Sequence, residues 1–242
     1  MSPTRLDQEM LRRGLARSRS EARRLIDQGR VAVEGRSRLK AAAHVDAATR
    51  IEVDGPTPLV GRAGDKLDAA LERFKIEVTG RRALDVGAAT GGFTDCLLRR
   101  GAVSVVAVDV GTGQFSTDLA ARSGVRSFEG LDFRQVDPVA IGAPFDLIVV
   151  DVSFISVCAL ASQLNVVATN GGDLVVLVKP QFEVGRERVG RGVVTDPKLH
   201  EEAVNDVRQC LTAAGLSVIE VMASPVKGRH GNQEFFLWAR KF

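Results

Sequence analysis

The sequence predicts an α/β protein in which helices cover both faces of a mostly parallel, seven-stranded sheet, after a small α+β module. Three observations lead to this prediction. Short apolar runs alternate with helix-like stretches from residue 82 to residue 240, as in a parallel sheet buried on both faces. A glycine-rich turn follows the first run, within 85–95, as in doubly wound folds that bind nucleotide-like ligands. Basic residues are in excess before residue 60.

Length and composition are those of an ordinary globular protein. The chain has 242 residues, of which 45% are hydrophobic and 26% charged, which fits one large domain or two unequal ones. Asp146 and Asp151 interrupt the longest apolar stretch, so no transmembrane helix is expected. The N-terminus lacks the apolar core of a signal peptide. We expect a cytoplasmic protein with no membrane partner.

The cysteines and the charge distribution indicate which kinds of site and of binding partner the sequence favours. Cys96, Cys158 and Cys210 are odd in number and widely spaced, which predicts buried thiols and neither a disulfide framework nor a metal site. Residues 1–60 hold 12 Lys/Arg against 8 Asp/Glu, whereas the remainder holds 21 against 22. This asymmetry indicates a basic binding module joined to a near-neutral body.

Two helices and two strands are predicted in the basic module. The first helix covers 5–15 and ends at Gly14, with three apolar residues on one face, namely Leu6, Met10 and Leu11. The second begins at Ser18, in a capping box with Glu21, and ends at Gly29. Its apolar face consists of Ala22, Leu25 and Ile26, and the short strands cover 31–33 and 51–53.

Six arginines crowd this helical pair with little acid between them: Arg12, Arg13, Arg17, Arg19, Arg23 and Arg24. The planar guanidinium fork suits phosphate. The order of residues 5–35 also resembles the S-four RNA-binding domain, with Lys40-Ala41 where a lysine-proline pair is common. The resemblance implies binding of structured RNA through backbone and shape. Our candidate RNA contacts are Arg5, Arg17, Arg19, Lys40 and Arg62, with Arg134 near the pocket rim.

A turn-rich linker at 54–58 predicts the domain boundary. We therefore expect an RNA-binding domain at 1–58 and a second domain at 59–242. The second domain opens with an amphipathic helix whose apolar positions are Leu67, Ala70, Leu71 and Phe74. Lys66 lies in the expected first turn, where a cation opposes the helix dipole. A solvated lysine and a functional lysine both remain open there.

Seven strands are predicted in the second domain, at 82–87, 103–109, 125–128, 145–151, 173–179, 217–223 and 234–240. The best-marked helix is 197–214, with Asp196 as its cap, Pro197 in its first turn and Gly215 after its end. Seven strands with a glycine turn after the first are the plan of the class I, Rossmann-like methyltransferase fold.

The glycine turn favours a nucleotide-like ligand. Its spacing is G-x-x-x-G-G and not the G-x-G-x-x-G of dinucleotide sites, and the leading Asp85 suits a cationic amino-acid end. Glycines admit close backbone approach, and a helix start offers free N–H groups. A turn with no ligand remains possible. The cofactor candidates here are Asp85, Gly87, Ala88, Gly91, Gly92 and Phe93.

Acidic residues recur near the carboxyl ends of the strands, where open α/β sheets bind ligands. Asp109 ends the second strand and is our candidate for a ribose hydroxyl pair. Asp132, after the third strand, is a candidate for the adenine amino group, and Asp151 ends the fourth. Lys179 ends a strand that is otherwise apolar, and burying a lysine is costly unless it is paired. A structural lysine that reaches solvent remains open.

The chain as a whole resembles the TlyA family of ribosomal RNA ribose methyltransferases, also described as haemolysins, which join an S-four domain to an FtsJ-like domain. The matching stretches are 62–67, 85–95, 151–156, 179–185 and 231–235. Asp65 beside Lys66 and the end of the chain at Phe242 depart from many members. The resemblance implies S-adenosylmethionine as cofactor and methylation of a ribose 2′-hydroxyl in ribosomal RNA, with cytidine as the expected nucleotide. It also implies a catalytic tetrad at Lys66, Asp151, Lys179 and Glu234, and a cofactor or base contact at Phe154.

Several other classes fit less well. The sequence lacks the motifs of a base methyltransferase. Residues 151–154 are not Asn-Pro-Pro-aromatic, and Cys158 does not belong to a Pro-Cys pair. A pseudouridine synthase leaves the glycine turn without a purpose, and the glycine spacing disfavours a nicotinamide oxidoreductase. A non-catalytic RNA-binding or haemolytic protein is the rival from another class, yet no amphipathic stretch is long or apolar enough for a membrane-active helix. The 185–192 loop, with Arg186, Arg188 and Arg191, either closes over substrate or is simply solvated.

Overall fold

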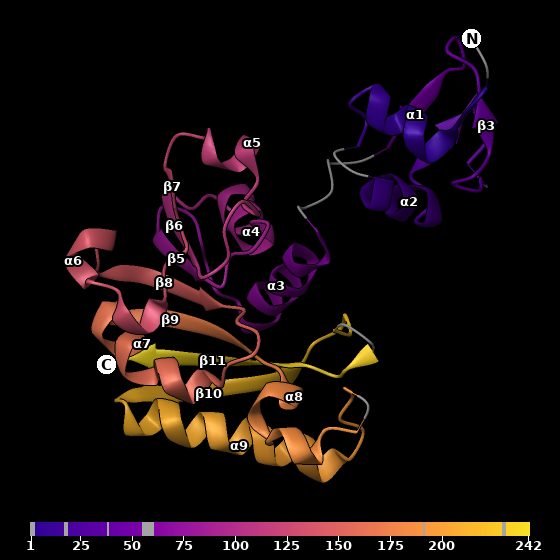
Figure 1. Ribbon diagram of the computed structural model, residues 1–242. Coiled ribbons are helices and arrows are strands. Elements are labelled where there is room, and N and C mark those ends of the chain that lie inside the picture. Colours follow the sequence, from indigo (N-terminus) through magenta and orange to yellow (C-terminus); the bar gives the residue numbers. More distant parts are fainter. Residues whose placement is uncertain (1–2, 17–18, 38, 55–60, 191, 229–230) are drawn as a thin grey trace. The chain divides into compact units, whose positions relative to one another are not determined.

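The computed structural model describes residues 3–16, 19–37, 39–54, 61–190, 192–228 and 231–242. The chain divides into two compact units, Met1–Gly61 and Arg62–Phe242 (Figure 1). The predicted boundary between 58 and 59 falls within 55–60, outside the described residues, as does the proposed helix cap Ser18.

The first unit packs two helices on short strands around a small core. Its elements are β1 (Thr4–Arg5), α1 (Leu6–Arg12), α2 (Arg19–Asp27), β2 (Val31–Val33), β3 (His44–Val45) and β4 (Ile51–Val53). β2 pairs antiparallel with β4, which confirms both predicted strands. Leu6 and Met10 are buried as predicted, but Leu11 is 41% exposed. The prediction for Leu11 was wrong because one residue turns a helix by about 100°, which carries Leu11 away from the face that Leu6 and Met10 share.

The second unit is built on one seven-stranded sheet in the order β10-β11-β9-β8-β5-β6-β7. Its strands are β5 (Arg82–Val86), β6 (Ser104–Asp109), β7 (Val125–Glu129), β8 (Phe145–Val150), β9 (Ala168–Val178), β10 (Leu216–Ala223) and β11 (Phe235–Lys241). β5 to β9 are parallel, whereas β11 runs antiparallel to both of its neighbours. All seven predicted strands are confirmed, although β9 begins five residues earlier than expected.

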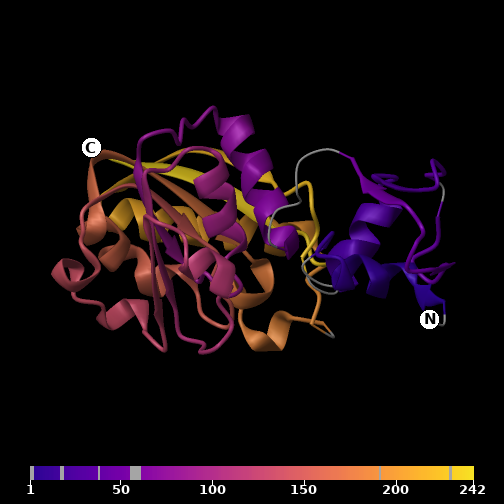
Figure 2. The same cartoon turned by 90° about the horizontal axis from the view of Figure 1, so that it is seen from above.

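Helices cover both faces of this sheet (Figures 1 and 2). Its helical segments are α3 (Gly61–Phe74), α4 (Gly92–Arg99), α5 (Thr117–Ala120), η1 (Phe133–Gln135), α6 (Pro138–Ile141), η2 (Val157–Leu160), α7 (Ala161–Val167), α8 (Pro180–Glu183), η3 (Arg186–Arg188) and α9 (Pro197–Ala213). Seen from above in Figure 2, the purple α3 and α4 lie on the near side and the yellow-orange α9 on the far side. Among the described residues, none of these helices is long and apolar enough to cross a membrane.

The side chains of β11 alternate between the two faces, as a strand requires. Phe236 packs 6.4 Å from Phe93 of α4, measured between ring centroids, and Trp238 packs 6.0 Å from Phe74 of α3. Leu237 and Ala239 enter the core on the opposite face. The alternation therefore fixes which face of the sheet each helix covers.

Lys66 lies in the second turn of α3, because the helix begins at Gly61 and not beside the lysine. The prediction of a first-turn lysine was therefore wrong by about one turn of 3.6 residues. The helix-dipole penalty, which falls off within the first turn, does not bear on this lysine.

A disulfide joins Cys158 of η2 to Cys210 of α9, with the two Cα atoms 5.3 Å apart. The prediction of three free thiols was wrong for this pair, and Cys96 alone is a free, buried thiol. The two cysteines are 52 residues apart in the sequence. Spacing along the chain carried no information about η2 and α9, which meet only after folding (Figure 1).

Asp173 lies within β9 and is 1% exposed. Its carboxylate accepts hydrogen bonds from Arg81 (2.6 Å), from Arg240 (2.9 Å) and from the indole N–H of Trp238 (2.8 Å). A buried carboxylate is tolerated when it is paired and hydrogen-bonded in this way. The cluster holds β9 against β11 and against the residue that precedes β5.

Candidate functional site

Three of the four predicted tetrad residues lie at one edge of the sheet. Asp151 directly follows β8 and Lys179 directly follows β9, and these two strands are parallel. Glu234 directly precedes β11, whose first residue Phe235 lies opposite Val178. The carboxyl ends of β8 and β9 and the start of β11 therefore meet where ligands bind in open α/β sheets.

The tetrad forms two ion pairs. Lys179 Nζ lies 2.5 Å from Asp151 Oδ1 and donates a hydrogen bond of 2.8 Å to Ser153 Oγ. Lys66 Nζ lies 2.5 Å from Glu234 Oε2. Lys66 is only 8% exposed and Glu234 2%, so the interpretation of Lys66 as a solvated surface lysine was wrong. Pairs removed from water need such close partners to offset their desolvation.

Ser153 is a site residue that the sequence analysis missed. It lies two positions after Asp151, inside a stretch that carried the family resemblance, and its hydroxyl accepts from Lys179. Its position in that stretch was the only available signal, because Lys179 is 26 residues away along the chain. Among the described residues, no group of three or more His, Cys, Asp and Glu side chains could hold a metal ion.

The glycine turn packs tightly against the same edge. Gly87 has φ +85°, and a Cβ atom there would lie 2.5 Å from the backbone oxygen of Asp151. Gly91 has φ +92°, and a Cβ atom there would lie 2.5 Å from the end of the Leu119 side chain. The left-handed backbone and the lack of space both require glycine. Gly92 then opens α4, and Ala88 is buried within the turn.

Asp85 lies beneath this turn and is fully buried. Its Oδ2 accepts a hydrogen bond of 2.7 Å from Thr94 Oγ1. Among the described residues, Oδ1 has no hydrogen-bond partner. Burial raises the pKa of Asp85 to about 7 against the hydrogen bond from Thr94, which lowers it. A buried carboxylate oxygen without a partner fits a cationic group of a ligand.

The other cofactor candidates are held by their neighbours. The two carboxylate oxygens of Asp109 accept the backbone N–H groups of Ala89 (2.8 Å) and Gly111 (2.7 Å), and each oxygen keeps a lone pair for a hydroxyl group. Phe93 is 1% exposed against Phe236, so its ring faces the core and only its backbone is near the turn.

Asp132 and Arg134 are bound to each other. Asp132 caps η1 and accepts hydrogen bonds from the Arg134 guanidinium at 2.5 to 3.1 Å. This guanidinium holds the pKa of Asp132 below its usual value. The structure therefore brings a predicted adenine contact and a predicted RNA contact into one exposed pair.

Phe154 is the most exposed large apolar side chain among the described residues, at 85%. Its φ is +66°, a left-handed conformation that is uncommon for a bulky residue. Its ring centroid lies 5.1 Å from that of Phe182, and the Lys179 ammonium lies 6.0 Å from the Phe182 ring. The exposed Phe154 ring thus packs on Phe182, whose own ring lies next to the Lys179 ammonium.

Two buried carboxylates of the first unit, those of Asp7 and Glu9, pair with five of its arginines. Asp7 is fully buried and receives Arg5, Arg19 and Arg23 at 3.0, 3.4 and 3.1 Å. The hydrogen bond from Arg5 is the main cause that holds the pKa of Asp7 well below its usual range. The sequence between Arg12 and Arg24 does hold little acid, but the fold brings Asp7 of α1 against Arg19 and Arg23 of α2.

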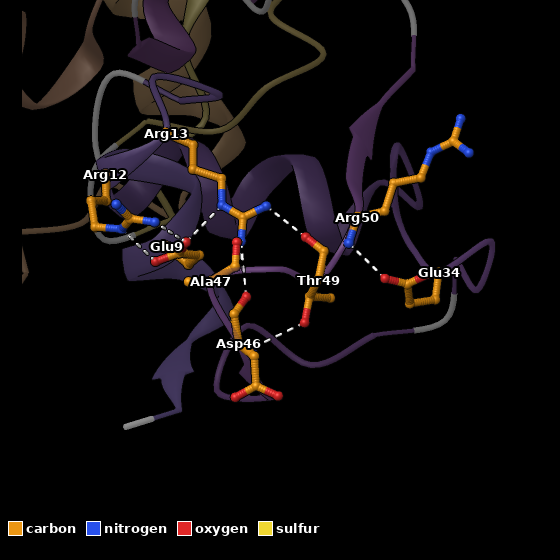
Figure 3. A network of polar contacts seen from close by, with 8 residues as sticks. All are labelled: Glu9, Arg12, Arg13, Glu34, Asp46, Ala47, Thr49 and Arg50. Atoms are coloured by element: carbon orange, nitrogen blue, oxygen red, sulfur yellow. Dashed lines mark hydrogen bonds and ion pairs between the residues drawn. The ribbon is translucent and has the colours of Figure 1, made fainter. Parts of the chain in front are cut away.

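Glu9 of α1 plays the same part for two further arginines (Figure 3). It accepts hydrogen bonds from Arg12 and Arg13, and Arg13 also donates to the backbone oxygens of Asp46, Ala47 and Thr49. Arg13 is therefore a structural residue that ties α1 to the loop before β4.

The remaining RNA candidates differ in what the structure shows of them. The side chains of Arg5 and Arg19 remain 34% and 46% exposed despite their pairing with Asp7, and Lys40 is exposed. The side chains of Arg17 and Arg62 lie outside the described residues. RNA contact at all of these positions stays a prediction.

The 185–192 loop is held at its far end by Asn232. The Asn232 side chain accepts from the Val194 N–H at 3.0 Å and donates to the Gly192 oxygen at 2.9 Å. Arg188 forms an ion pair with Glu202 of α9. Arg191 and the side chain of Arg186 lie outside the described residues.

Comparison with known proteins gives the same two-part division. The sequence matches the FtsJ-like methyltransferase family over residues 59–241 and the S4 domain family over residues 4–51. It is 46% identical to the 16S/23S rRNA (cytidine-2′-O)-methyltransferase TlyA of Mycobacterium tuberculosis, over 98% of this chain and 89% of that protein. It is 36% identical to Hemolysin A of Brachyspira hyodysenteriae, over 96% of this chain and 97% of that protein.

Solved structures agree with this division. A Streptococcus thermophilus protein that carries a hemolysin name aligns with a TM-score of 0.75 and 37% identity, over 100% of this chain and 89% of that one. An S-adenosylmethionine-dependent methyltransferase from Mesorhizobium loti aligns with a TM-score of 0.56 and 18% identity, over 75% of this chain and all of that one. At that identity the second likeness concerns the fold alone.

Proposed function

Because the chain belongs to the TlyA family of FtsJ-like methyltransferases, we propose that it methylates the ribose 2′-hydroxyl of a cytidine in ribosomal RNA. The observation that carries this proposal is the pairing of Lys179 with Asp151 and of Lys66 with Glu234, at the sheet edge where the glycine turn lies. The match of residues 4–51 to the S4 domain family supports an RNA substrate. A cytoplasmic location follows from that substrate and belongs to the same proposal.

The residues of the glycine turn fit S-adenosylmethionine. The unpartnered Oδ1 of Asp85 suits the cationic amino group, and the Asp109 carboxylate suits a ribose hydroxyl pair. Gly87 lets the turn pack directly on the backbone of Asp151, since a Cβ atom there would lie 2.5 Å from the Asp151 oxygen, and this contact joins the turn to the Lys179–Asp151 pair. When bound, this cofactor supplies an electrophilic methyl group on a sulfonium centre.

Lys179 is the proposed general base. A ribose hydroxyl is a weak nucleophile while it keeps its proton, so a group that accepts the proton during attack lowers the barrier. The proton moves from the hydroxyl oxygen to the amine form of Lys179 Nζ, and Asp151 stabilises the resulting ammonium at 2.5 Å. Ser153 fixes the direction of the amine through its hydroxyl. The Lys66–Glu234 ion pair contributes further fixed charges to the proposed site.

The substitution Lys179→Ala tests the base. We expect the variant to fold and to bind ribosomal RNA, while methyl transfer falls by roughly 10²- to 10⁴-fold, the usual contribution of a general base. Incorporation of labelled methyl groups into ribosomal subunits that lack the modification measures the effect. Lys198→Ala, which removes an exposed lysine of α9, is the matched control.

Mass mapping of the product locates the methyl group on the sugar or on the base. Near-normal incorporation by Lys179→Ala would exclude Lys179 as the base. A methyl group on a base would replace the proposal with base methylation, whereas no incorporation by the unaltered protein would favour a non-catalytic RNA-binding role.

A further inference from the structure

Two segments that follow neighbouring strands, 151–157 and 179–183, are fastened to each other at three points. At the first point, Lys179 contacts Asp151 and Ser153. At the second, Phe154 packs on Phe182. The proposed mechanism uses the first contact and leaves the third, at Glu183, without a role.

The third point is a carboxylate clamp. Glu183 Oε2 accepts a hydrogen bond of 2.5 Å from Ser156 Oγ, and its Oε1 accepts one of 3.1 Å from the Val157 N–H. Ser156 Oγ in turn accepts from the Cys158 N–H at 3.1 Å and caps η2. Both oxygens of Glu183 are thus committed to the end of the 151–157 segment.

The clamp lies next to a strained residue. Phe154 holds φ at +66°, and such a conformation is unfavourable for a bulky residue and persists only where its surroundings determine it. Ser153 is held on one side of Phe154 by Lys179, and Ser156 is held on the other by Glu183. Without one of these contacts, the segment could relax and carry the exposed Phe154 ring away from Lys179.

We propose that Glu183 is a positioning residue, which acts by holding the 151–157 segment so that the Phe154 ring stays packed on Phe182, the ring next to Lys179. Nothing in the clamp touches the reacting atoms, so Glu183 contributes through Phe154 and not directly. This inference rests on the proposed function for its activity readout. It also makes a structural statement that can be measured without any activity.

A double-mutant cycle tests the route through Phe154. Glu183→Ala should lower kcat/KM for methylation of ribosomal subunits by roughly tenfold or more, the scale set by small misplacements of reacting groups. In a Phe154→Ala background, the same Glu183→Ala change should lower kcat/KM little further, because the ring that it positions is gone.

The conservative variant separates positioning from charge. Glu183→Gln keeps a carbonyl oxygen for the Val157 N–H and an amide that can donate to Ser156 Oγ, so it should retain most of the activity. Glu77→Gln, an equal change at an exposed site after α3, is the matched control. Full additivity of the Glu183 and Phe154 substitutions would overturn the inference, and so would an unaltered kcat/KM in Glu183→Ala. If Glu183→Ala does not fold, the cycle is run with Ser156→Ala, which removes the same contact from the other side.

Fluorine NMR gives a readout that is independent of methyl transfer. In protein labelled with fluorophenylalanine, the Phe154 signal is assigned by its loss in Phe154→Leu. We expect Glu183→Ala to shift or broaden this signal, and Glu77→Gln to leave it unchanged. An unaltered signal in Glu183→Ala sinks the inference even if the protein methylates RNA. Absence of methyl transfer by the unaltered protein sinks the proposed function and leaves this structural result standing.

Discussion

Asp85 is fully buried beneath the glycine turn, with one carboxylate oxygen bonded to Thr94 and the other without a partner among the described residues. Burial raises its pKa to about 7 because the charged form loses hydration that Thr94 only partly replaces. Below that pKa the neutral acid is tolerated, and above it the folded protein carries a buried charge. A cationic ligand group at the free oxygen would remove this cost.

The pH dependence of stability tests this account of Asp85. The folded-state pKa of about 7 exceeds the ordinary value of 3.8, so the folded state binds more protons than the unfolded state between these two values. The contribution of Asp85 is therefore fully present below pH 4 and is lost as pH rises through 7.

Asp85→Asn should remove this loss. Relative to wild type, the variant should gain unfolding free energy between pH 5 and pH 8, by about 3 kcal/mol at most, because about two pH units of the shift lie above pH 5. Denaturant titration of both ligand-free proteins at the two pH values measures the difference. An equal difference at both values would show that Asp85 does not titrate in this window.

Whether a residue of the site could be predicted from the sequence depended on how far away its partners are in the sequence. Lys66, Asp151, Lys179 and Glu234 could be named because short stretches around them resemble a known family. Ser153 and Glu183 could not, because their partners lie 26 and 27 residues away and become neighbours only when β8 and β9 align. The pairing of Arg19 with Asp7, which is 12 residues away, was hidden for the same reason.

Among the elements, strands were predictable where an apolar run was long and bounded by turn residues. That condition holds for the inner parallel strands β5, β6, β8 and β9, which are buried on both faces, but not for the edge strand β7, none of whose residues is buried. It fails for β1 and β3, which have two residues each and no room for alternation. It also fails for the first five residues of β9, where Asn170, Gly171 and Gly172 resemble a turn.

The disulfide between η2 and α9 could not be predicted from the composition of the chain. The Cys158–Cys210 disulfide closes 52 residues of chain, and closing a loop of that length restricts the unfolded state by about 4 kcal/mol at the entropic limit. Cys158→Ser should therefore lower the unfolding free energy in non-reducing buffer and have little effect in reducing buffer.

Wild type with and without reductant is the reference for this comparison. A thiol assay on the denatured, unreduced protein should detect one thiol, that of Cys96. Detection of three thiols would show that the disulfide is absent in solution.

At the scale of the whole molecule, the chain joins a basic unit to a near-neutral one. The first unit has an excess of positive charge, and the buried carboxylates of Asp7 and Glu9 hold several of its arginine side chains in place. Guanidinium groups fixed on a buried carboxylate lose less freedom when they meet phosphate than freely moving side chains do. The first unit therefore has the features of a surface prepared for an RNA backbone.

Salt dependence tests this reading of the first unit. If phosphate contacts dominate, the affinity for ribosomal RNA should fall steeply as salt rises. Arg19→Gln should weaken binding to unrelated RNA sequences equally and reduce the slope of log K against log salt by about 1. Lys75→Gln, which removes an exposed charge from the second unit, should leave the slope unchanged. An affinity that does not change with salt would contradict the basic-module interpretation.

The buried Asp173 cluster fixes the position of β9 relative to its neighbouring segments. Asp173 and Lys179 share β9, so each position along that strand adds about 3.3 Å to the distance from one to the other. A shift of β9 by one residue would turn each of its side chains to the opposite face of the sheet. It would also break the hydrogen bonds of Asp173 with Arg81 and Arg240. The buried salt bridges of Asp173 therefore set the register of β9, and this register determines where Lys179 lies at the end of the strand.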